Sequence, residues 1–577
     1  MHIPPMEISK KHFWLLAAVC ACTLFPFLGE TLFNTRGEPR EAVVALSMLQ
    51  DGNWILPVNN GVDLAYKPPL FHWMVAIVSW LCGGVSEFTS RVPSALALSL
   101  MVLAGYVFYA RRRGTEVAFL AALVTLSNFE VHRAGVACRV DMVLTLMIVA
   151  ALYSLYRWTE RDLRGMPWLA LLCLVGAFLS KGPVGLGLPC LVIGIFCLLR
   201  GYGFWRTFLR LAGVALLACL LSGLWYVAAW QQGGQRFLDL VYEENVLRLL
   251  GKMSYESHVN PWPYNVMTLV AGFVPYTLLA VFALCVVRWR VPRFEPAEWW
   301  RRLRAHVRTV DPVRLFTFLS FAVIFVFYCI PKSKRSVYLL PVYPFLSYYL
   351  AELFLWLRSH HERVLQVFGR LLAVLAVLLT LLFGVVRAGC VPESWLGGGS
   401  HAAQNQAMLR ALGSTPLSLV DWCLCLLPVV TVWVYMRVRG HDSRARARRL
   451  YAMIALVFAL FVSLDAVYQP LVLNTKSDKP QAEFVRRTVP EGLVYSFRTD
   501  VVPGNPLHPF TINYYLGDRV VPFTAFMPRS GYLLTGDNDI EAFRQRYPDY
   551  RVRLVADFNH RSCDDRRMLY FYHFNRP

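Results

Sequence analysis

Residues 364–388 form the sequence VLQVFGRLLAVLAVLLTLLFGVVRA, an apolar run whose only charged side chains are Arg370 and Arg387. A helix of about 20 such residues, rising 1.5 Å per residue, crosses the roughly 30 Å hydrocarbon layer of a membrane. Apolar runs long enough to do so recur from about residue 11 to about residue 468. We therefore predict an α-helical protein that crosses a membrane many times.

The composition of the whole chain supports this prediction. Of the 577 residues, 56% are hydrophobic and only 16% are charged, whereas soluble domains carry about a quarter charged residues. The formal net charge of +21 comes from short Lys and Arg clusters between the apolar runs. Basic loops stay in the cytoplasm and so set the orientation of a membrane protein. We interpret the positive charge as a sign of topology and do not expect nucleic acid as a partner.

The basic clusters also predict the number of membrane spans. If all of them face the cytoplasm, the spans between them must come in pairs. Thirteen spans satisfy this rule, with a cytoplasmic N-terminus and a C-terminus on the outer side. We expect these spans near residues 11–29, 93–110, 116–132, 140–156, 167–180, 183–199, 208–230, 264–287, 314–330, 337–357, 364–388, 417–436 and 450–468.

Two segments are expected to lie outside the spans. Residues 70–82 are apolar but, at about 13 residues, too short to cross, so we predict a juxtamembrane helix in an outer loop over residues 31–92. From residue 474 the composition becomes that of a soluble protein, which divides the chain into a membrane domain (1–473) and an extracytoplasmic domain (474–577). The latter is predicted to be a small α/β domain, with strands near residues 492–497, 519–523, 531–534, 551–557 and 568–573 and helices near residues 481–487, 510–515 and 539–547.

Polar residues collect where spans end on the predicted outer side. They occupy the loops 31–69 and 231–263 and the short turns around residues 141, 181 and 332–335. Because these segments share one membrane face, we expect them to form one cavity. A transporter would place charged groups at mid-depth, where these spans are nearly free of charge. The pattern therefore favours chemistry at the membrane surface over transport.

The residue types in these loops suit a phosphate-bearing lipid. Arginine offers a bidentate fork and lysine a point charge for phosphate oxygens, and a carboxylate among them can take the proton of an acceptor hydroxyl or orient it. We expect Glu38 and Asp141 to be catalytic. The residues expected to bind substrate are Arg40, Lys67, Arg139, Lys181, His258, Lys332, Lys334 and Arg335.

Each of these residues also has a simpler structural explanation. Asp141 could be a helix cap at the mouth of a span, and Glu38 a surface ion pair of little consequence. Lys67 could be an interfacial anchor whose charged end reaches water. The cysteines contain no CxxC pair, so they predict no metal or redox site.

Several short motifs in the same order resemble a known family. They are GEPR (37–40), YKPPL (66–70), RVPSA (91–95), RVDMVLT (139–145), KGP (181–183) and YLLPVYP (338–344). In these the chain resembles the aminoarabinose transferases of lipid A and their protein O-mannosyltransferase relatives. These are membrane glycosyltransferases of the GT-C class that use polyprenyl-phosphate-linked sugars. The resemblance covers roughly the first 350 residues.

The resemblance implies roles for particular residues. It assigns the acidic motif of the first outer loop to Gly37-Glu38, the second acidic position to Asp141, and the lysine that meets the carrier phosphate to Lys67. The family usually has Asp-Glu in the first loop, so Gly37 departs from the pattern and leaves Glu38 as the first-loop candidate. Tyr66 stands where an acidic residue often precedes the lysine, so neither a divalent metal here nor aminoarabinose as the sugar follows from the resemblance.

The expected function is transfer of a sugar from a polyprenyl-phosphate-linked donor to an envelope acceptor such as a lipid A-like glycolipid. We expect an inverting in-line displacement on the periplasmic face of a bacterial inner membrane. A protein O-mannosyltransferase-like activity is one alternative, and a flippase or transporter of lipid-linked sugar is another. A non-catalytic scaffold is a third.

Overall fold

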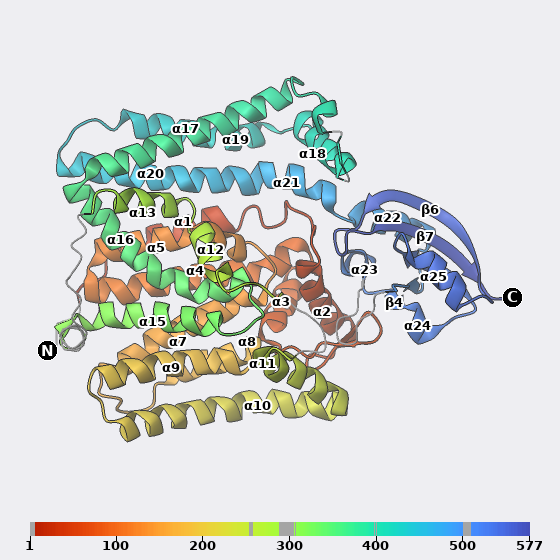
Figure 1. The fold of residues 1–577 in the computed structure, drawn as a ribbon, viewed down its shortest axis with the longest axis horizontal. Coiled ribbons are helices and arrows are strands. Elements are labelled where there is room, and N and C mark those ends of the chain that lie inside the picture. The colour runs from red at the N-terminus through yellow and green to blue at the C-terminus, as the bar shows by residue number, and fades with distance from the viewer. Residues whose placement is uncertain are drawn as a thin grey trace.

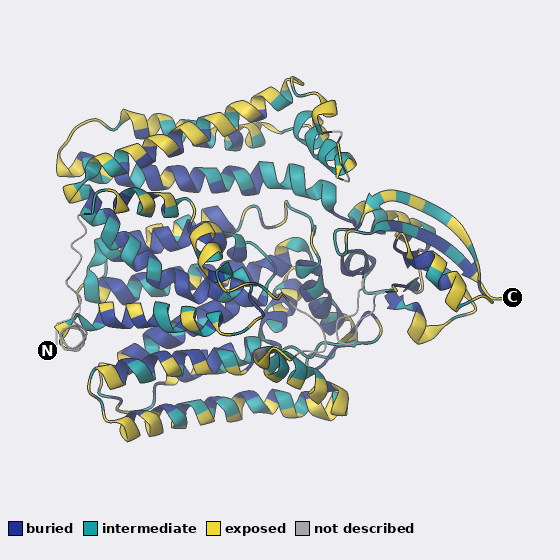
Figure 2. Cartoon of the chain, viewed as in Figure 1, coloured by how far each residue is buried: buried dark blue, intermediate teal, exposed yellow. Residues whose placement is uncertain are grey.

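Long helices lying side by side make up most of the protein, and a small sheet domain lies at one end of them (Figure 1). This computed structural model describes residues 6–252, 258–287, 305, 307, 309–396, 398–399, 401–499 and 509–577. Residues inside the helical part are mostly buried, whereas many residues of the outlying helices are exposed (Figure 2). Many of these exposed residues are apolar. Exposed leucines such as Leu216, Leu220 and Leu224 suit contact with lipid, because a soluble surface of this size would be polar.

The helical part contains the following elements. They are α1 (Lys10–Leu24), α2 (Gly37–Asp51), α3 (Leu70–Leu81), α4 (Glu87–Arg113), α5 (Thr115–Leu126), α6 (Phe129–Gly135), α7 (Val140–Thr159), α8 (Trp168–Lys181), α9 (Pro183–Leu199), α10 (Phe204–Tyr242), η1 (Glu243–Leu247), α11 (Arg248–Leu250), α12 (Tyr264–Gly272), α13 (Tyr276–Leu284), α15 (Pro312–Cys329), η2 (Ser336–Val342), α16 (Tyr343–His360), α17 (Glu362–Arg387), η3 (Glu393–Leu396), α18 (Ala402–Ser414), α19 (Leu419–Arg437), α20 (Ser443–Ser463), η4 (Leu464–Tyr468), α21 (Gln469–Leu473) and η5 (Asn474–Lys476).

The prediction of a multi-span helical protein is confirmed, but the number thirteen is not. Within the described residues, eight helices are long and apolar enough to cross a membrane, or nine if the bent pair α12 and α13 is one span. The other four expected spans fall on α1, α5, α8 and α9, which have 15, 12, 14 and 17 residues. Thirteen spans and the orientation of the termini therefore stay predictions.

Two expected spans are each divided into two helices, one at a proline and the other at a helix-capping asparagine. The segment 264–287 bends by 103° between α12 and α13, where Pro275 removes a backbone donor that a continuous helix needs. The segment 116–132 stops at Ser127 and restarts as α6, because the Asn128 side chain accepts a hydrogen bond from the Val131 N–H and caps the new helix.

The predicted outer loop contains three short structured segments. Helix α3 begins after Pro69, as the sequence predicts, and packs against α2 and α4. Between α2 and α3 the chain forms a small hairpin of strands β1 (Val58–Asn59) and β2 (Asp63–Leu64). Figure 1 places α2 at the end of the helical part nearest the sheet domain.

The C-terminal segment forms the predicted α/β domain. Its strands are β3 (Val494–Ser496), β4 (Val520–Pro522), β5 (Ser530–Thr535), β6 (Arg551–Arg561) and β7 (Met568–Asn575) in the order β4-β3-β5-β7-β6. Strands β4, β3 and β5 are parallel, and β5, β7 and β6 are antiparallel. Side chains alternate between the two faces, so Leu533 and its neighbour Leu534 join separate apolar clusters. The helices are α22 (Lys479–Thr488), α23 (Phe510–Leu516), α24 (Phe523–Phe526) and α25 (Asp539–Arg546).

Candidate active site

Helix α2 carries two buried carboxylates in its first turns. Glu38 and Glu41 are three residues apart and therefore lie on neighbouring positions of one helix face. They are 8% and 6% exposed. A carboxylate near a helix N-terminus is favoured by the helix dipole, but a buried one also needs positive or hydrogen-bonding partners. The two residues find different partners.

Glu41 lies among basic groups from three segments. Its Oε1 atom accepts hydrogen bonds from Lys67 Nζ at 2.6 Å and from Arg40 Nη2 at 3.0 Å. Its Oε2 atom lies 2.9 Å from Nε2 of the buried His72 on α3. Burial raises the pKa of Glu41, but the charges of Lys67 and Arg40 outweigh it and hold the pKa well below its ordinary value. Glu41 is therefore an ionised carboxylate at the centre of a basic cluster.

Lys67 and Arg40 are the partly exposed members of this cluster. Their side chains are 34% and 36% exposed, whereas that of Glu41 is 7% exposed. Desolvation and the charge of Arg40 lower the pKa of Lys67, and the charge of Glu41 acts in the opposite direction. The contact with Glu41 uses one of the three ammonium protons, which leaves two for a ligand.

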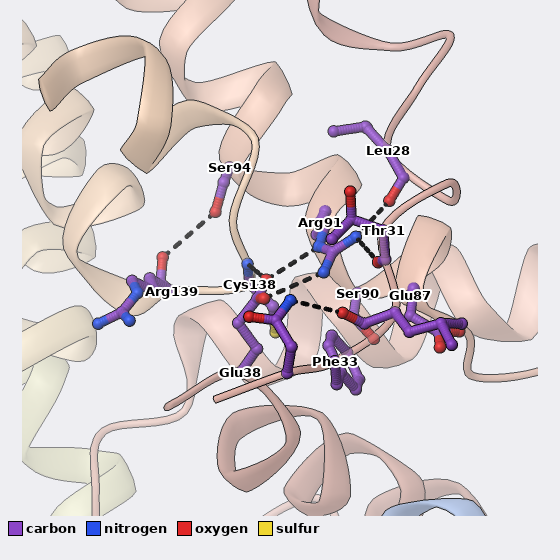
Figure 3. A network of polar contacts seen from close by, with 12 residues as sticks. Leu28, Thr31, Phe33, Glu38, Glu87, Ser90, Arg91, Ser94, Cys138 and Arg139 are labelled. Atoms are coloured by element: carbon purple, nitrogen blue, oxygen red, sulfur yellow. Dashed lines mark hydrogen bonds and ion pairs between the residues drawn. The ribbon is translucent and has the colours of Figure 1, made fainter. Parts of the chain in front are cut away.

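Glu38 is enclosed by the buried Arg91 of α4 (Figure 3). Arg91 Nε and Nη2 donate to the two carboxylate oxygens of Glu38 at 2.8 and 3.0 Å, and the Cys138 N–H donates to Oε1 at 2.8 Å. Arg91 Nη1 also donates to the carbonyls of Leu28 and Thr31 at 2.7 and 2.6 Å. Burial raises the pKa of Glu38, but Arg91 outweighs it, so the pKa lies below its ordinary value. Glu38 therefore ties α2 to α4 and to two loops.

Asp141 forms a second acidic centre in the first turn of α7. It is 8% exposed, and it accepts a hydrogen bond from Lys181 Nζ at the end of α8. The Lys181 ammonium lies 4.4 Å from the ring centroid of Tyr338. Gly182 ends α8 with a φ of 74°, and a Cβ atom there would lie 2.6 Å from Asn245 Oδ1. Glycine thus lets the Lys181 turn pack closely against the segment that follows α10.

Arg139 lies between the two acidic centres. A Cβ atom on Gly37 would lie 3.0 Å from Arg139 Nη2, which places this guanidinium directly beside the start of α2. The charge of Arg139 also lowers the pKa of Glu38. Its Nε atom is buried with no hydrogen-bond partner among the described residues. Arg139 therefore brings positive charge to the start of α2 from the loop that leads into Asp141.

His258 lies near several arginines. Desolvation, together with the charges of Arg335, Arg248 and Arg40, lowers the pKa of His258 to about 4. These arginines come from three distant parts of the sequence. His258 is neutral at neutral pH, so it offers a hydrogen bond to a ligand and no positive charge.

The lysines of the 332–335 turn differ from each other. Lys332 is exposed, whereas Lys334 is 6% exposed. Lys334 Nζ donates to the carbonyls of Pro331 and Asn260 at 2.8 and 3.4 Å. Lys334 thereby joins its own turn to the segment after His258. Its predicted contact with substrate stays a prediction, as do the catalytic roles of Glu38 and Asp141.

The structure brings several predicted residues together in pairs, through contacts that sequence reasoning did not identify. Arg40 and Lys67 share Glu41, and Lys181 pairs with Asp141. Glu41, which directly follows the GEPR motif, bonds to Lys67 and His72, and Arg91 bonds to Glu38. These contacts hold the first loop together. Tyr66 donates to Glu244 at 3.2 Å, and Glu244 pairs with Arg248 at 2.5 Å, which joins this loop to the segment after α10. In the part of the chain that the structure describes, no group of three or more His, Cys, Asp or Glu side chains is placed to hold a metal ion.

Comparison with known proteins gives a family model, several relatives and a solved structure with a similar fold. A family model described as dolichyl-phosphate-mannose-protein mannosyltransferase matches residues 66–226. The chain is 28% identical over 340 residues to undecaprenyl phosphate-alpha-4-amino-4-deoxy-L-arabinose arabinosyl transferase 2 of Proteus mirabilis (strain HI4320), covering 58% of this chain and 57% of that protein. It is 30% identical over 386 residues to an uncharacterized protein of Aquifex aeolicus (strain VF5), covering 65% of this chain and 79% of that protein.

Another uncharacterized Aquifex aeolicus protein is 28% identical over 343 residues, which cover 64% of its length. The chain thus spans less than two thirds of the length of this relative and of the Proteus enzyme. The fold matches the crystal structure of ArnT from Cupriavidus metallidurans bound to undecaprenyl phosphate, with a TM-score of 0.68, 18% identity and 98% of both chains covered. The relatives, the fold and the family model agree, and the chain belongs to the GT-C membrane glycosyltransferases that include the aminoarabinose and protein mannosyltransferases.

Proposed function

We propose that the protein transfers a sugar from a polyprenyl-phosphate-linked donor to an envelope acceptor similar to lipid A. The observations that carry the proposal are the pair of Glu41 with the partly exposed Lys67 and the second acidic centre, where Asp141 pairs with Lys181. The Proteus relative, named as an undecaprenyl-phosphate sugar transferase, and the undecaprenyl phosphate bound to the Cupriavidus protein support a lipid-linked donor.

Lys67 and Arg40 are the residues best placed to bind the donor phosphate. A sugar carbon attached to phosphate already has a good leaving group, so the protein must mainly hold the reactants in line and neutralise the departing charge. Glu41 fixes both cations through one of its oxygens. Each cation keeps further N–H groups that can donate to phosphate oxygens. A polyprenyl phosphate without its sugar should therefore bind here as well.

Asp141 is the residue best suited to activate the acceptor. In an inverting displacement the bond from the anomeric carbon to the phosphate oxygen breaks as the bond to the acceptor oxygen forms. A hydroxyl acceptor gives its proton to a carboxylate base, whereas a phosphate acceptor is already ionised and needs mainly cations. Both oxygens of Glu38 are engaged by Arg91, so we assign the base to Asp141 and a positioning role to Glu38.

The catalytic centre would face the periplasm of a bacterial inner membrane, with residues 1–473 as the membrane domain and residues 474–577 on the outer side. This follows from the positive-inside pattern of the sequence. The description of the matched family model favours a protein hydroxyl as the second candidate acceptor. The acidic and basic pairs described above lie at span ends and in loops, where a surface reaction needs them and an ion-coupled transporter does not.

The test uses the full chain in proteoliposomes without an ion gradient. We expect label to pass from a polyprenyl-phosphate-linked sugar to an envelope lipid extract. The Lys67→Ala variant should lose this transfer, and the exposed control Lys10→Ala should keep it. Mass spectrometry of envelope lipids and proteins with and without the gene identifies the acceptor by a single lost glycosyl mass. Movement of intact donor across the bilayer without transfer would instead support a transporter.

A further inference from the structure

The C-terminal domain meets the membrane domain through helix α23 and the turn that follows it. Helix α23 packs against α2, the helix that carries Glu41. The turn contains Gly517 and Asp518 with φ values of 77° and 60°, and this left-handed backbone directs the chain away from the helix end. Asp518 is the polar group at the centre of this contact.

Asp518 joins three segments through one carboxylate. Its Oδ2 atom accepts a hydrogen bond from Ser47 Oγ of α2 at 2.8 Å. Its Oδ1 atom accepts from the Asn60 N–H of the hairpin at 2.9 Å and from Asn513 Nδ2 of its own domain at 2.6 Å. A carboxylate can accept several hydrogen bonds at once, which makes it suited to hold separate segments together.

The hairpin tip is pressed closely against the C-terminal domain. Asn60 and Asn513 are both fully buried, and Asn513 Nδ2 also donates to Asn60 Oδ1 at 2.6 Å. A Cβ atom on Gly61 would lie 2.7 Å from Val521 Cγ1, and Gly61 has a φ of 73°. The hairpin therefore has little freedom to move while the C-terminal domain stays in place.

Of the three segments that Asp518 joins, the two in the membrane domain, α2 and the hairpin, also meet in the candidate site. Ser47 lies six residues after Glu41 on α2, which is less than two turns of one helix. Asn60 lies seven residues before Lys67 in the connection from the hairpin. Glu41 and Lys67 close the loop at its other end with their contact of 2.6 Å. Asp518, which belongs to the C-terminal domain, thus restrains the distance between Glu41 and Lys67 in the membrane domain.

We propose that Asp518 is a positioning residue, through which the C-terminal domain sets the placement of Lys67 relative to Glu41. This inference rests on the proposed function where it assigns the donor phosphate to Lys67. The proposal gives the C-terminal domain a role in the reaction without contact with the reacting atoms.

Other contacts keep the domain attached when Asp518 is changed. Tyr514 Oη donates to the Val85 carbonyl at 3.2 Å, and Tyr515 Oη donates to Glu87 at 2.6 Å. Ser477 Oγ donates to the Phe33 carbonyl at 2.6 Å. A substitution at Asp518 therefore tests placement of the hairpin, and Tyr514→Phe is a matched control that removes a domain contact elsewhere.

The experiment compares Asp518→Ala, Asp518→Asn and Tyr514→Phe in the full chain in lipid nanodiscs. Amide hydrogen exchange of residues 58–69 reports placement, and binding of undecaprenyl phosphate without sugar reports Lys67. We expect exchange to rise about tenfold in Asp518→Ala, and affinity to fall about tenfold. Asp518→Asn should restore most of both, because its amide oxygen still accepts from the Asn60 N–H. Tyr514→Phe should leave both as in the wild type.

The two readouts separate failure of this inference from failure of the proposed function. Unchanged exchange in Asp518→Ala would overturn the inference, as would faster exchange with unchanged affinity or an equal effect of Tyr514→Phe. Wild-type protein that binds no undecaprenyl phosphate would overturn the proposed function, and with it the assigned consequence for Lys67. In that case, exchange that is faster in Asp518→Ala but not in Tyr514→Phe would still show that Asp518 holds the hairpin in place.

Discussion

The two carboxylates at the start of α2 are three residues apart and yet have opposite surroundings. Glu38 is paired with an arginine that is itself 3% exposed and bonded to two carbonyls. Glu41 is paired with Lys67, whose side chain is 34% exposed. A buried ion pair holds segments together, whereas a pair with a partly exposed cation can exchange contacts with a ligand. The difference shows that two acidic residues three positions apart on one helix need not have the same role.

The strongest test of this comparison removes the cationic partner of Glu38. Arg91→Ala leaves a buried carboxylate without its counter-charge, which costs about 3–5 kcal/mol of folding free energy. We expect a large fall in the yield of folded protein and in its unfolding temperature, measured in detergent. Arg91→Lys should not restore stability, because lysine cannot make the two parallel bonds to Glu38.

The control for Arg91 is the exposed pair of Arg410 and Glu393, whose side chains are 61% and 44% exposed. Arg410→Ala should leave the free energy of unfolding almost unchanged, because solvent screens such exposed pairs. Equal losses in Arg91→Ala and Arg410→Ala would mean that the Glu38 pair is not a structural tie.

The corresponding test at Glu41 removes Lys67. We expect Lys67→Ala to lower sugar transfer about a thousandfold, because the departing phosphate loses a charge that neutralises it. The unfolding temperature should change little, since Glu41 keeps Arg40 and His72 as partners. Transfer kinetics and thermal unfolding of the same preparation measure both. Unfolding comparable to that of Arg91→Ala would remove the contrast between the two carboxylates.

A third test asks which carboxylate acts on the acceptor. Asp141→Asn keeps an oxygen that can accept from Lys181 but removes the base, so we expect kcat to fall about a hundredfold with little change in KM. Glu38→Gln should mainly lower stability, because it weakens the bonds from Arg91. Normal turnover in Asp141→Asn would show that the acceptor needs no base from this residue, as expected for a phosphate.

Much of the fold follows from local pattern. The apolar runs predicted the helices, and alternating residues predicted all five strands of the C-terminal sheet, because burial on one or two faces imposes these periods on a sequence. The number of spans cannot be read from the sequence in this way. The run 116–132 is long enough to cross a membrane, but the structure divides it at the Asn128 cap. Capping of a new helix inside an apolar run depends on contacts around it.

The candidate site was predictable in part. Charged residues at span ends indicated the loops that contain Glu38, Lys67 and Asp141, and the resemblance pointed to the same residues, whose roles stay predictions. The choice between Glu38 and Glu41 as the partner of Lys67 could not be made, because it depends on Arg91, 53 residues after Glu38, which occupies one carboxylate and leaves the other. The role of Asp518 could not be predicted either, since it bonds to Ser47 across 471 residues of sequence.

The smallest expected effect concerns His258, at the edge of the basic cluster that surrounds Glu41. Its pKa of about 4 lies below the ordinary value of 6.5, so the unfolded chain binds a proton more readily than the folded one between these values. Folded protein should therefore lose stability as the pH falls from about 6.5 to about 4, and His258→Gln should lose less over that window. Above pH 6.5 the difference between their unfolding temperatures should no longer change with pH. Because His258 is neutral there, His258→Gln should also leave the pH profile of transfer between 6.5 and 8 unchanged, whereas a shifted profile in that range would show that the imidazole carries charge in the working protein.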